Sequence, residues 1–114
     1  MSDSITIDHF AGVKILVGRI ISAEAITGSE KMLHLTVDVG EEERTILSGI
    51  AKYYTPEDLI NTSCLIVGNL EPRAMLGFES NGMILCTSHT DSSGNSVVRI
   101  ISPPPDVPPG SLVS

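Results

Sequence analysis

The most regular pattern of hydrophobic and polar positions lies between Leu33 and Val39, where every second residue is apolar and the residues between are polar or charged. This period of two is typical of a β-strand with one buried face. Residues 17–26 precede it and predict a longer strand, in which Gly18 and several small residues permit a bend or bulge. A bent first strand of this kind is typical of small β-barrels, so the pattern favours a barrel.

Short runs predict the remaining strands. Residues 44–48 predict a third strand that pairs with the second as a hairpin. Residues 65–67 and 83–86 are apolar runs bounded by Gly and Asn, which is typical of buried strands. Residues 97–101 follow a polar turn and predict a sixth extended segment.

One short helix interrupts these strands. Thr55 offers an N-cap and Pro56 suits the first helical turn, while Glu57 and Asp58 complement the positive end of the helix dipole. The helix falls between the third and fourth predicted strands, which is the order of elements in an oligonucleotide/oligosaccharide-binding (OB) fold. The sequence therefore predicts an all-β protein built on a five-stranded OB-fold barrel with a short helix between strands three and four.

A chain of 114 residues is long enough for one hydrophobic core but not for two. We expect a single domain over residues 1–114, with its core at about residues 13–87 and a C-terminal extension at residues 88–114. Two proline-rich runs exclude this extension from a central strand, so it either lies on a surface or remains flexible. The apolar residues that favour a surface position are Val107, Leu112 and Val113.

The charge of the chain is unusual for one candidate class, the nucleic-acid binders. Fourteen acidic and seven basic side chains give a net charge of −7, and residues 5–87 still carry 11 acidic against 6 basic residues. Nucleic-acid binders are normally basic, because Lys and Arg neutralise phosphates and release counterions. RNA binding by this chain would therefore need a local basic patch.

Catalysis, metal binding and cofactor binding find little support in the sequence. Glycine-rich phosphate motifs are absent, and the three histidines lack neighbouring Cys, Asp or Glu at ligand or nucleophile spacing. Cys64 and Cys86 form no CxxC pair, so we expect two reduced, buried thiols. We accordingly expect a non-enzymatic protein without metal or cofactor. The absence of a signal-peptide pattern and of a membrane-spanning apolar run predicts a cytoplasmic location.

Three basic residues are candidates for phosphate contacts. Lys31 opens the second strand after a turn, Lys52 precedes the helix, and Arg73 lies in the loop after the fourth strand. Each on its own is typical of an ordinary solvated side chain. An OB barrel would nevertheless bring these segments toward one side, where they form a phosphate-contacting patch without a positive total charge.

Three further candidates flank the loop that carries Arg73. Ser80 and Met83 are either a polar loop residue and the first core residue of strand five, or groups at the barrel mouth that contact a sugar and stack on a base. Asn69 ends the fourth strand and offers an amide that can read a base edge or the RNA backbone.

Short sequence blocks along residues 7–113 occur in the order that is found in one known family. The blocks are Ile7-Asp8-His9-Phe10, Val17-Gly18-Arg19-Ile20, Glu30-Lys31-Met32-Leu33, Val37-Asp38-Val39-Gly40, Ser48-Gly49-Ile50, Tyr54-Thr55-Pro56-Glu57-Asp58-Leu59, Asn69-Leu70-Glu71-Pro72-Arg73 and Glu79-Ser80-Asn81-Gly82-Met83. In these blocks the chain resembles the tRNA-binding domain family. Its members are free-standing small proteins, C-terminal domains of many methionyl-tRNA synthetases, and cytokine-like synthetase cofactors.

The resemblance implies an OB-fold homodimer, held by N- and C-terminal extensions, that binds the outside corner of tRNA by shape rather than by sequence. Residues 97–113 would supply the dimer-forming tail. The RNA-contacting positions would fall on Lys31, Lys52, Asn69, Arg73, Ser80 and Met83. Such a protein acts without catalysis, as a free-standing helper or as a trans-acting domain for a tRNA synthetase.

Two positions depart from the family pattern. Leu16 stands in a segment where the family usually has an arginine, and Glu71 stands where a lysine is usual, so each removes a positive charge. Two alternatives follow: a protein-interaction module that dimerises or docks on a synthetase with weak RNA affinity, and a chaperone-like peptide binder of the same fold. The block Ser80-Asn81-Gly82-Met83 favours the tRNA-binding branch over the chaperone-like one.

Overall fold

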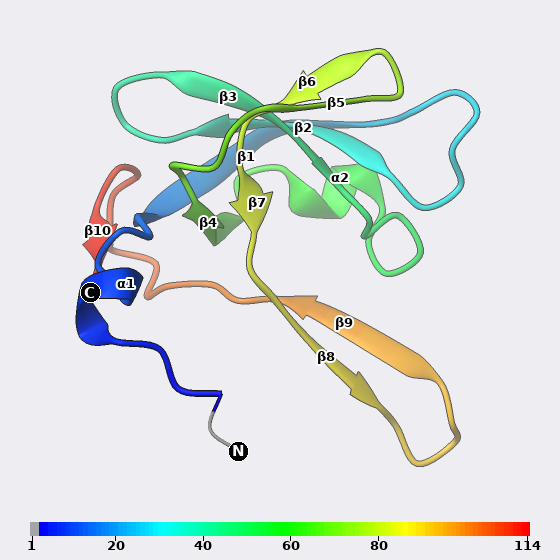
Figure 1. Ribbon diagram of the computed structural model, residues 1–114. Helices are drawn as coiled ribbons and strands as arrows, with labels where there is room; N and C mark the ends of the chain where they lie inside the picture. The colour runs from blue at the N-terminus through cyan, green and yellow to red at the C-terminus, as the bar shows by residue number, and fades with distance from the viewer. Residues whose placement is uncertain (1–2) are drawn as a thin grey trace.

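The computed structural model describes residues 3–114 as a curled β-sheet with two one-turn helices (Figure 1). The main sheet has the order β3-β2-β1-β4-β7, and β10 pairs with β1 beside this path. Its strands are β1 Ile15–Ala25, β2 Leu33–Asp38, β3 Glu43–Ser48, β4 Ser63–Val67, β7 Met83–Ile84 and β10 Leu112–Val113. Two separate hairpins are β5 Arg73–Met75 with β6 Phe78–Ser80, and β8 Cys86–Thr90 with β9 Ser96–Ile100. The predicted all-β, barrel-like class is confirmed.

β1 is the strand around which the sheet curls. Its first half pairs with β4 and its second half pairs with β2. The register between β1 and β2 shifts between Ile20 and Ser22, as the small residues of this strand predicted. A Cβ at Gly18 would lie 2.6 Å from Val37 Cγ1, so glycine lets the two strands approach at the bend.

The hydrophobic core lies inside the curl. Side chains of β2 alternate between buried and half-buried, in agreement with their period of two. The short helix α2, Pro56–Leu59, lies between β3 and β4 along the chain, where the sequence predicted a helix. It contributes the fully buried Leu59 to the core. Thr55 occupies the N-cap position, but its side chain forms no capping hydrogen bond. The largest fully buried side chains are Ile20, Leu33, Leu35, Val37, Ile46, Leu59, Cys64 and Ile66.

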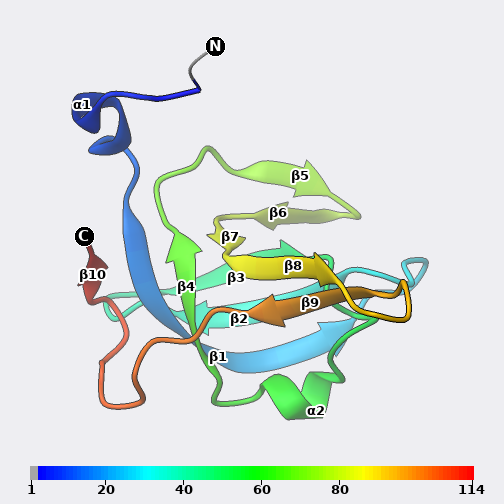
Figure 2. The same ribbon diagram turned by 90° about the horizontal axis from the view of Figure 1, so that it is seen from below.

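Hydrogen bonds fix the loop between β6 and β7 against β3. The backbone N–H of Asn81 donates to the carbonyl of Thr45 at 2.8 Å, and the N–H of Leu47 donates to Ser80 Oγ at 3.0 Å. The β5–β6 hairpin therefore lies along one side of the curled sheet (Figures 1 and 2). The sequence pattern predicted only a loop in this region, so the hairpin is a difference from the expectation.

The first helix, at residues 7–10, and the last strand, β10, lie on the same side of the molecule (Figures 1 and 2). α1, Ile7–Phe10, is a single turn in which Thr6 Oγ1 accepts the N–H of His9 at 3.1 Å, and none of its residues is buried. In the C-terminal segment, strand β10 pairs with β1. The N–H of Gly110 also donates to the Val17 carbonyl at 2.7 Å. The proline-rich segment thus lies on the barrel surface, which was the favoured expectation.

Candidate nucleic-acid interface

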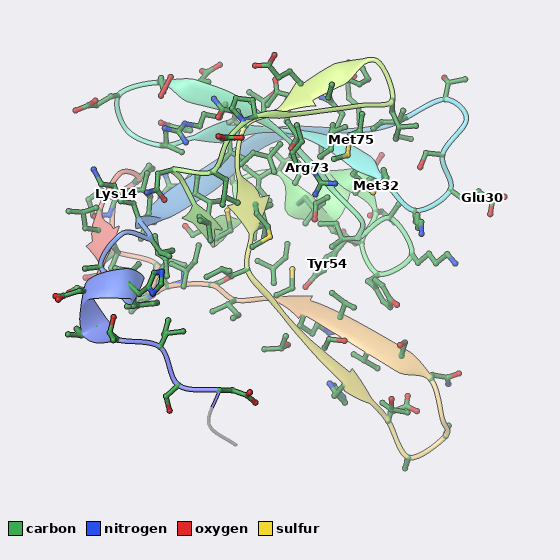
Figure 3. All side chains as sticks on the ribbon, viewed as in Figure 1. Lys14, Glu30, Met32, Tyr54, Arg73 and Met75 are labelled. Carbon is green, nitrogen blue, oxygen red and sulfur yellow. The ribbon has the colours of Figure 1, made fainter. Side chains whose placement is uncertain are left out.

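Arg73, Ser80 and Met83 line one cavity of about 90 Å³, which we call the arginine cavity. The hairpin register pairs Arg73 with Ser80, and Met83 follows in β7. In Figure 3 the side chains of Arg73 and Met75 extend from β5 toward the middle of the molecule. The remaining lining residues are Leu47, Leu70, Glu71, Met75 and Gly82. The structure thus brings together three of the six expected residues.

Ser80 and Met83 differ in what they offer to a ligand. Ser80 is only 5% exposed, and its Oγ accepts the Leu47 N–H, so the hydroxyl supports the fold. The same hydroxyl still has its own proton to donate into the arginine cavity. Met83 is 49% exposed, which leaves its flexible thioether free to pack against a ligand.

Lys31 and Lys52 line a second cavity of about 370 Å³, which we call the lysine cavity, together with Gly28, Ser29 and Glu30. Both lysine side chains are exposed. The N–H of Ala51 donates to the carbonyl of Lys31 at 3.0 Å, which holds the two loops together. Two of the predicted bases therefore form a local pair although the whole chain is acidic.

Asn69 lines neither cavity, and each polar atom of its amide forms one hydrogen bond within the protein. Its Oδ1 accepts the N–H of Lys14 at 2.9 Å, and its Nδ2 donates to the carbonyl of Gly12. These bonds fasten the segment before β1 to the end of β4. Asn69 is exposed, and its amide keeps one further lone pair on Oδ1 and one further N–H on Nδ2 for a ligand.

The positive charges of the two cavities have no ion-pair partner within residues 3–114. The ion pair in that range joins Arg44 to Glu42, with 3.3 Å between Nη2 and Oε1. The predicted bases that keep their charge for a ligand are Lys31, Lys52 and Arg73. A carboxylate nevertheless lines each cavity, Glu30 in the lysine cavity and Glu71 in the arginine cavity.

Sequence reasoning missed a third cavity of about 310 Å³, which we call the aromatic cavity. It is lined by Glu24, Ala25, Ile26, Thr27, His34, Leu76 and Phe78. The rings of His34 and Phe78 have centroids 4.6 Å apart. The sequence signal for this cavity was Phe78, directly after Gly77. The chain has only four Phe and Tyr residues, so an aromatic residue beside a turn glycine is a distinctive feature. Sequence reasoning also missed Arg44 of β3, whose guanidinium donates a hydrogen bond to the carbonyl of Gly68 and so joins β3 to the end of β4.

The cysteines of the barrel are free thiols of low reactivity. Burial, with a smaller contribution from the nearby Cys86, raises the pKa of Cys64 from 9.0 to about 12. Burial also raises the pKa of Cys86, so both remain protonated and weakly nucleophilic at neutral pH. In residues 3–114 no three His, Cys, Asp or Glu side chains are grouped as they would be around a metal ion. No helix in the described part of the chain has the length and apolar character to cross a membrane.

The lysine and aromatic cavities lie away from α1 and β10. In both ribbon views the β1–β2 loop and the β5–β6 turn point to the side opposite α1 and β10 (Figures 1 and 2). Glu30, which lines the lysine cavity, and Lys14, just before β1, lie at opposite sides of Figure 3. A molecule bound at α1 and β10 would therefore leave the lysine and aromatic cavities open.

Comparison with known proteins identifies the family of the chain. The family model described as "Putative tRNA binding domain" matches residues 15–112. The chain is 44% identical over 110 residues to the methionine–tRNA ligase of Polaromonas sp., an alignment that covers 96% of this chain and 16% of that enzyme. The chain therefore spans about one sixth of the length of such relatives.

Solved structures share the fold over almost the whole chain. The MetRS related protein from Pyrococcus horikoshii is 35% identical with a TM-score of 0.88, and the alignment covers 99% of this chain and 100% of that one. The chaperone CsaA from Bacillus anthracis is 25% identical with a TM-score of 0.83, over 97% of this chain and 99% of that one. With the family model matched across most of its length, the chain belongs to the tRNA-binding domain family.

Proposed function

We propose that this chain binds tRNA without catalysing a reaction and recognises the shape of the folded RNA rather than its sequence. The observation that carries the proposal is that two cavities present Lys31, Lys52 and Arg73 on a barrel of the tRNA-binding family. Cationic side chains on separate loops contact the phosphates of separate nucleotides. Their fixed spacing then selects a folded backbone.

The residues of the two cavities have distinct roles in this proposal. Lys31, Lys52 and Arg73 contact phosphates and set the position of the RNA. The Ser80 hydroxyl donates to a ribose or phosphate oxygen, and Met83 packs on a base or sugar. Asn69 contributes by holding the segment before β1, through its bonds to backbone groups. Because the net charge of −7 repels RNA, binding depends on these local charges.

We propose that the chain forms a homodimer through its two ends. A one-turn helix such as α1 is too short to be stable in water unless it packs on another surface. Exposed apolar side chains gather on the terminal segments: Ile5, Ile7, Phe10, Val13, Leu112 and Val113. A second copy supplies a matching surface by two-fold symmetry. The dimer would present two sets of cavities to one RNA.

The likeness to a small part of methionine–tRNA ligases supports a role in trans beside a tRNA synthetase. In that role the chain would raise the local concentration of tRNA at the enzyme. Aminoacylation by a methionine–tRNA ligase that lacks such a domain tests this at limiting tRNA. A lower KM for tRNA with unchanged kcat supports the role, and an unchanged KM contradicts it.

The deciding experiment titrates labelled unfractionated tRNA with the purified protein at several salt concentrations. An unstructured RNA of the same length serves as competitor. Saturable binding that prefers tRNA over the competitor supports the proposal, provided that the logarithm of the binding constant falls linearly with the logarithm of the salt concentration. Wild-type protein that binds no tRNA at low salt contradicts it.

Variants locate the binding surface in the same titration. Replacing both Lys31 and Lys52 with Ala should reduce the salt slope by roughly 1 to 2, because each phosphate contact contributes about 0.7 to 0.9. Arg99→Ala is a matched control, since Arg99 is exposed on β9 and lines none of the three cavities. A Lys31→Ala/Arg73→Ala variant that binds as tightly as wild type would exclude this surface.

A protein-binding role is the second candidate. Leu70, Leu76, Phe78 and Met83, around the arginine and aromatic cavities, are each 41% to 49% exposed, and the fold is shared with the chaperone CsaA. Exposed apolar groups of this kind suit an unfolded peptide or a synthetase surface. Suppressed aggregation of an unfolded protein, or co-purification with a synthetase, without tRNA affinity would support this candidate.

A further inference from the structure

The aromatic cavity adjoins both the lysine and the arginine cavity and has no part in the tRNA binding proposed above. Thr27 lines the aromatic cavity and the next residue, Gly28, lines the lysine cavity, so both cavities border the β1–β2 loop. Leu76 lines the aromatic cavity and its neighbour Met75 lines the arginine cavity, so both cavities border the β5–β6 hairpin. The aromatic cavity is therefore a neighbour of both other cavities.

The aromatic cavity presents a ring to solvent. Phe78 is 41% exposed and lies against His34 with an angle of 56° between the two rings. His34 belongs to the half-buried set of β2 residues and pairs with Glu24 across β1 and β2. One side of Phe78 is thus supported by an imidazole, and the remainder of the ring is free for a planar ligand.

The turn that carries Phe78 has an unusual backbone. Leu76 and Gly77 are the two residues between β5 and β6, with φ of +52° and +83°. This left-handed conformation is normal for Asn-Gly turns and unfavourable for a leucine. Leu76 is 47% exposed, so core packing does not account for its presence. Strained residues of this kind cluster where a ligand binds.

We propose that the aromatic cavity binds an unpaired nucleobase of the RNA, which stacks on Phe78 while the lysine and arginine cavities contact phosphates on either side. The inference rests on the proposed tRNA binding and adds the base to it. Glu24 in the cavity wall repels phosphate, so the base rather than the backbone enters. A carboxylate also accepts hydrogen bonds from the amino group of a base. Stacking tolerates every base, which fits recognition by shape.

Substitutions at Phe78 test the ring itself in the tRNA titration. Phe78→Leu keeps apolar volume and removes the ring, and should weaken binding about 5- to 100-fold. The salt slope should not change, because no phosphate contact is lost. Phe78→Tyr keeps the ring and should bind within about twofold of wild type. Ile60→Ala is the control, since Ile60 is 42% exposed and lines none of the three cavities.

The outcomes separate this inference from the proposed function. A wild-type protein without tRNA affinity overturns both. Wild-type binding that is lost in Lys31→Ala/Lys52→Ala but kept in Phe78→Leu overturns the base site alone. Phe78→Leu that loses affinity for an unfolded peptide but keeps its affinity for tRNA also overturns the base site, in favour of a peptide site.

Discussion

The backbone N–H of Leu47 donates a hydrogen bond of 3.0 Å to Ser80 Oγ, although Ser80 also lines the arginine cavity. This bond joins β3 to the end of β6, and the bond from Asn81 N–H to the Thr45 carbonyl extends the join. Ser80 therefore contributes to the fold as well as to the surface proposed for RNA. A loss of binding on substitution of Ser80 has to be read together with stability.

Ser80→Ala should lower the free energy of unfolding by roughly 1–3 kcal/mol, because the buried N–H of Leu47 would lose its acceptor. Urea denaturation measures the change. Ser88→Ala on β8 is the matched control, since Ser88 is exposed, and should change stability by less than about 0.5 kcal/mol. If Ser80→Ala were as stable as wild type, the hydroxyl would not support the fold, and a loss of RNA affinity could be assigned to direct contact.

The strands that the sequence predicted best are those whose burial follows a local pattern. β2 alternates along its length, and its neighbour β1 carries small residues at the bend, so both follow from adjacent residues. The β5–β6 hairpin was missed because its turn, Leu76-Gly77, lacks the usual Asn-Gly signal and its strands have three residues each. α1 was missed because a single turn with no buried residue has no apolar periodicity.

The candidate site depends on contacts that no local pattern encodes. The order of strands allowed Lys31 and Lys52 to be placed on neighbouring loops, and the structure places them in one cavity. Phe78 and His34 are far apart in the sequence and meet only because the hairpin folds against the sheet. The hydrogen bonds of the Asn69 amide likewise depend on the path of the segment before β1.

Gly110→Ala should destabilise the protein and release the C-terminal segment. Gly110 has a φ of +91°, and a Cβ there would lie 2.8 Å from the carbonyl oxygen of Val39. Gly94→Ala is the matched control, because Gly94 has a φ of +85° with no atom within 4 Å of its Cβ position. The control isolates the backbone cost of about 1 kcal/mol, and Gly110→Ala should cost at least about 1 kcal/mol more.

Light scattering of the same two variants tests the proposed homodimer. Leu112 of β10 lies two residues after Gly110 and is 73% exposed on the surface proposed for the dimer. Displacement of this segment in Gly110→Ala should therefore shift the measured mass toward that of a monomer. Gly94→Ala should keep the mass of the wild type. A wild type that is itself monomeric at micromolar concentration would remove the dimer from the proposal.

Leu76→Asn should raise stability although it replaces an apolar side chain. Asparagine tolerates the left-handed backbone of this turn, where leucine is strained. We expect a gain of about 0.5–1 kcal/mol in urea denaturation. Leu70→Asn is the control, since Leu70 is 46% exposed and is not among the described non-glycine residues with positive φ. Equal effects of the two substitutions would show that the turn conformation is not the cause.

The burial of Cys64 predicts how stability depends on alkaline pH. The unfolded chain releases this thiol proton near pH 9.0, whereas burial and the nearby Cys86 hold it in the folded protein up to about pH 12. The folded state therefore binds more protons than the unfolded state between these values, and its stability falls as pH rises through this window. Urea denaturation at pH 8 and pH 10 should show a wild-type loss that exceeds the loss in Cys64→Ala by about 1 kcal/mol. Comparing the pH difference within each variant cancels the cost of the smaller side chain. A Cys64→Ala variant with the same pH dependence as wild type would show that this thiol titrates at an ordinary pKa.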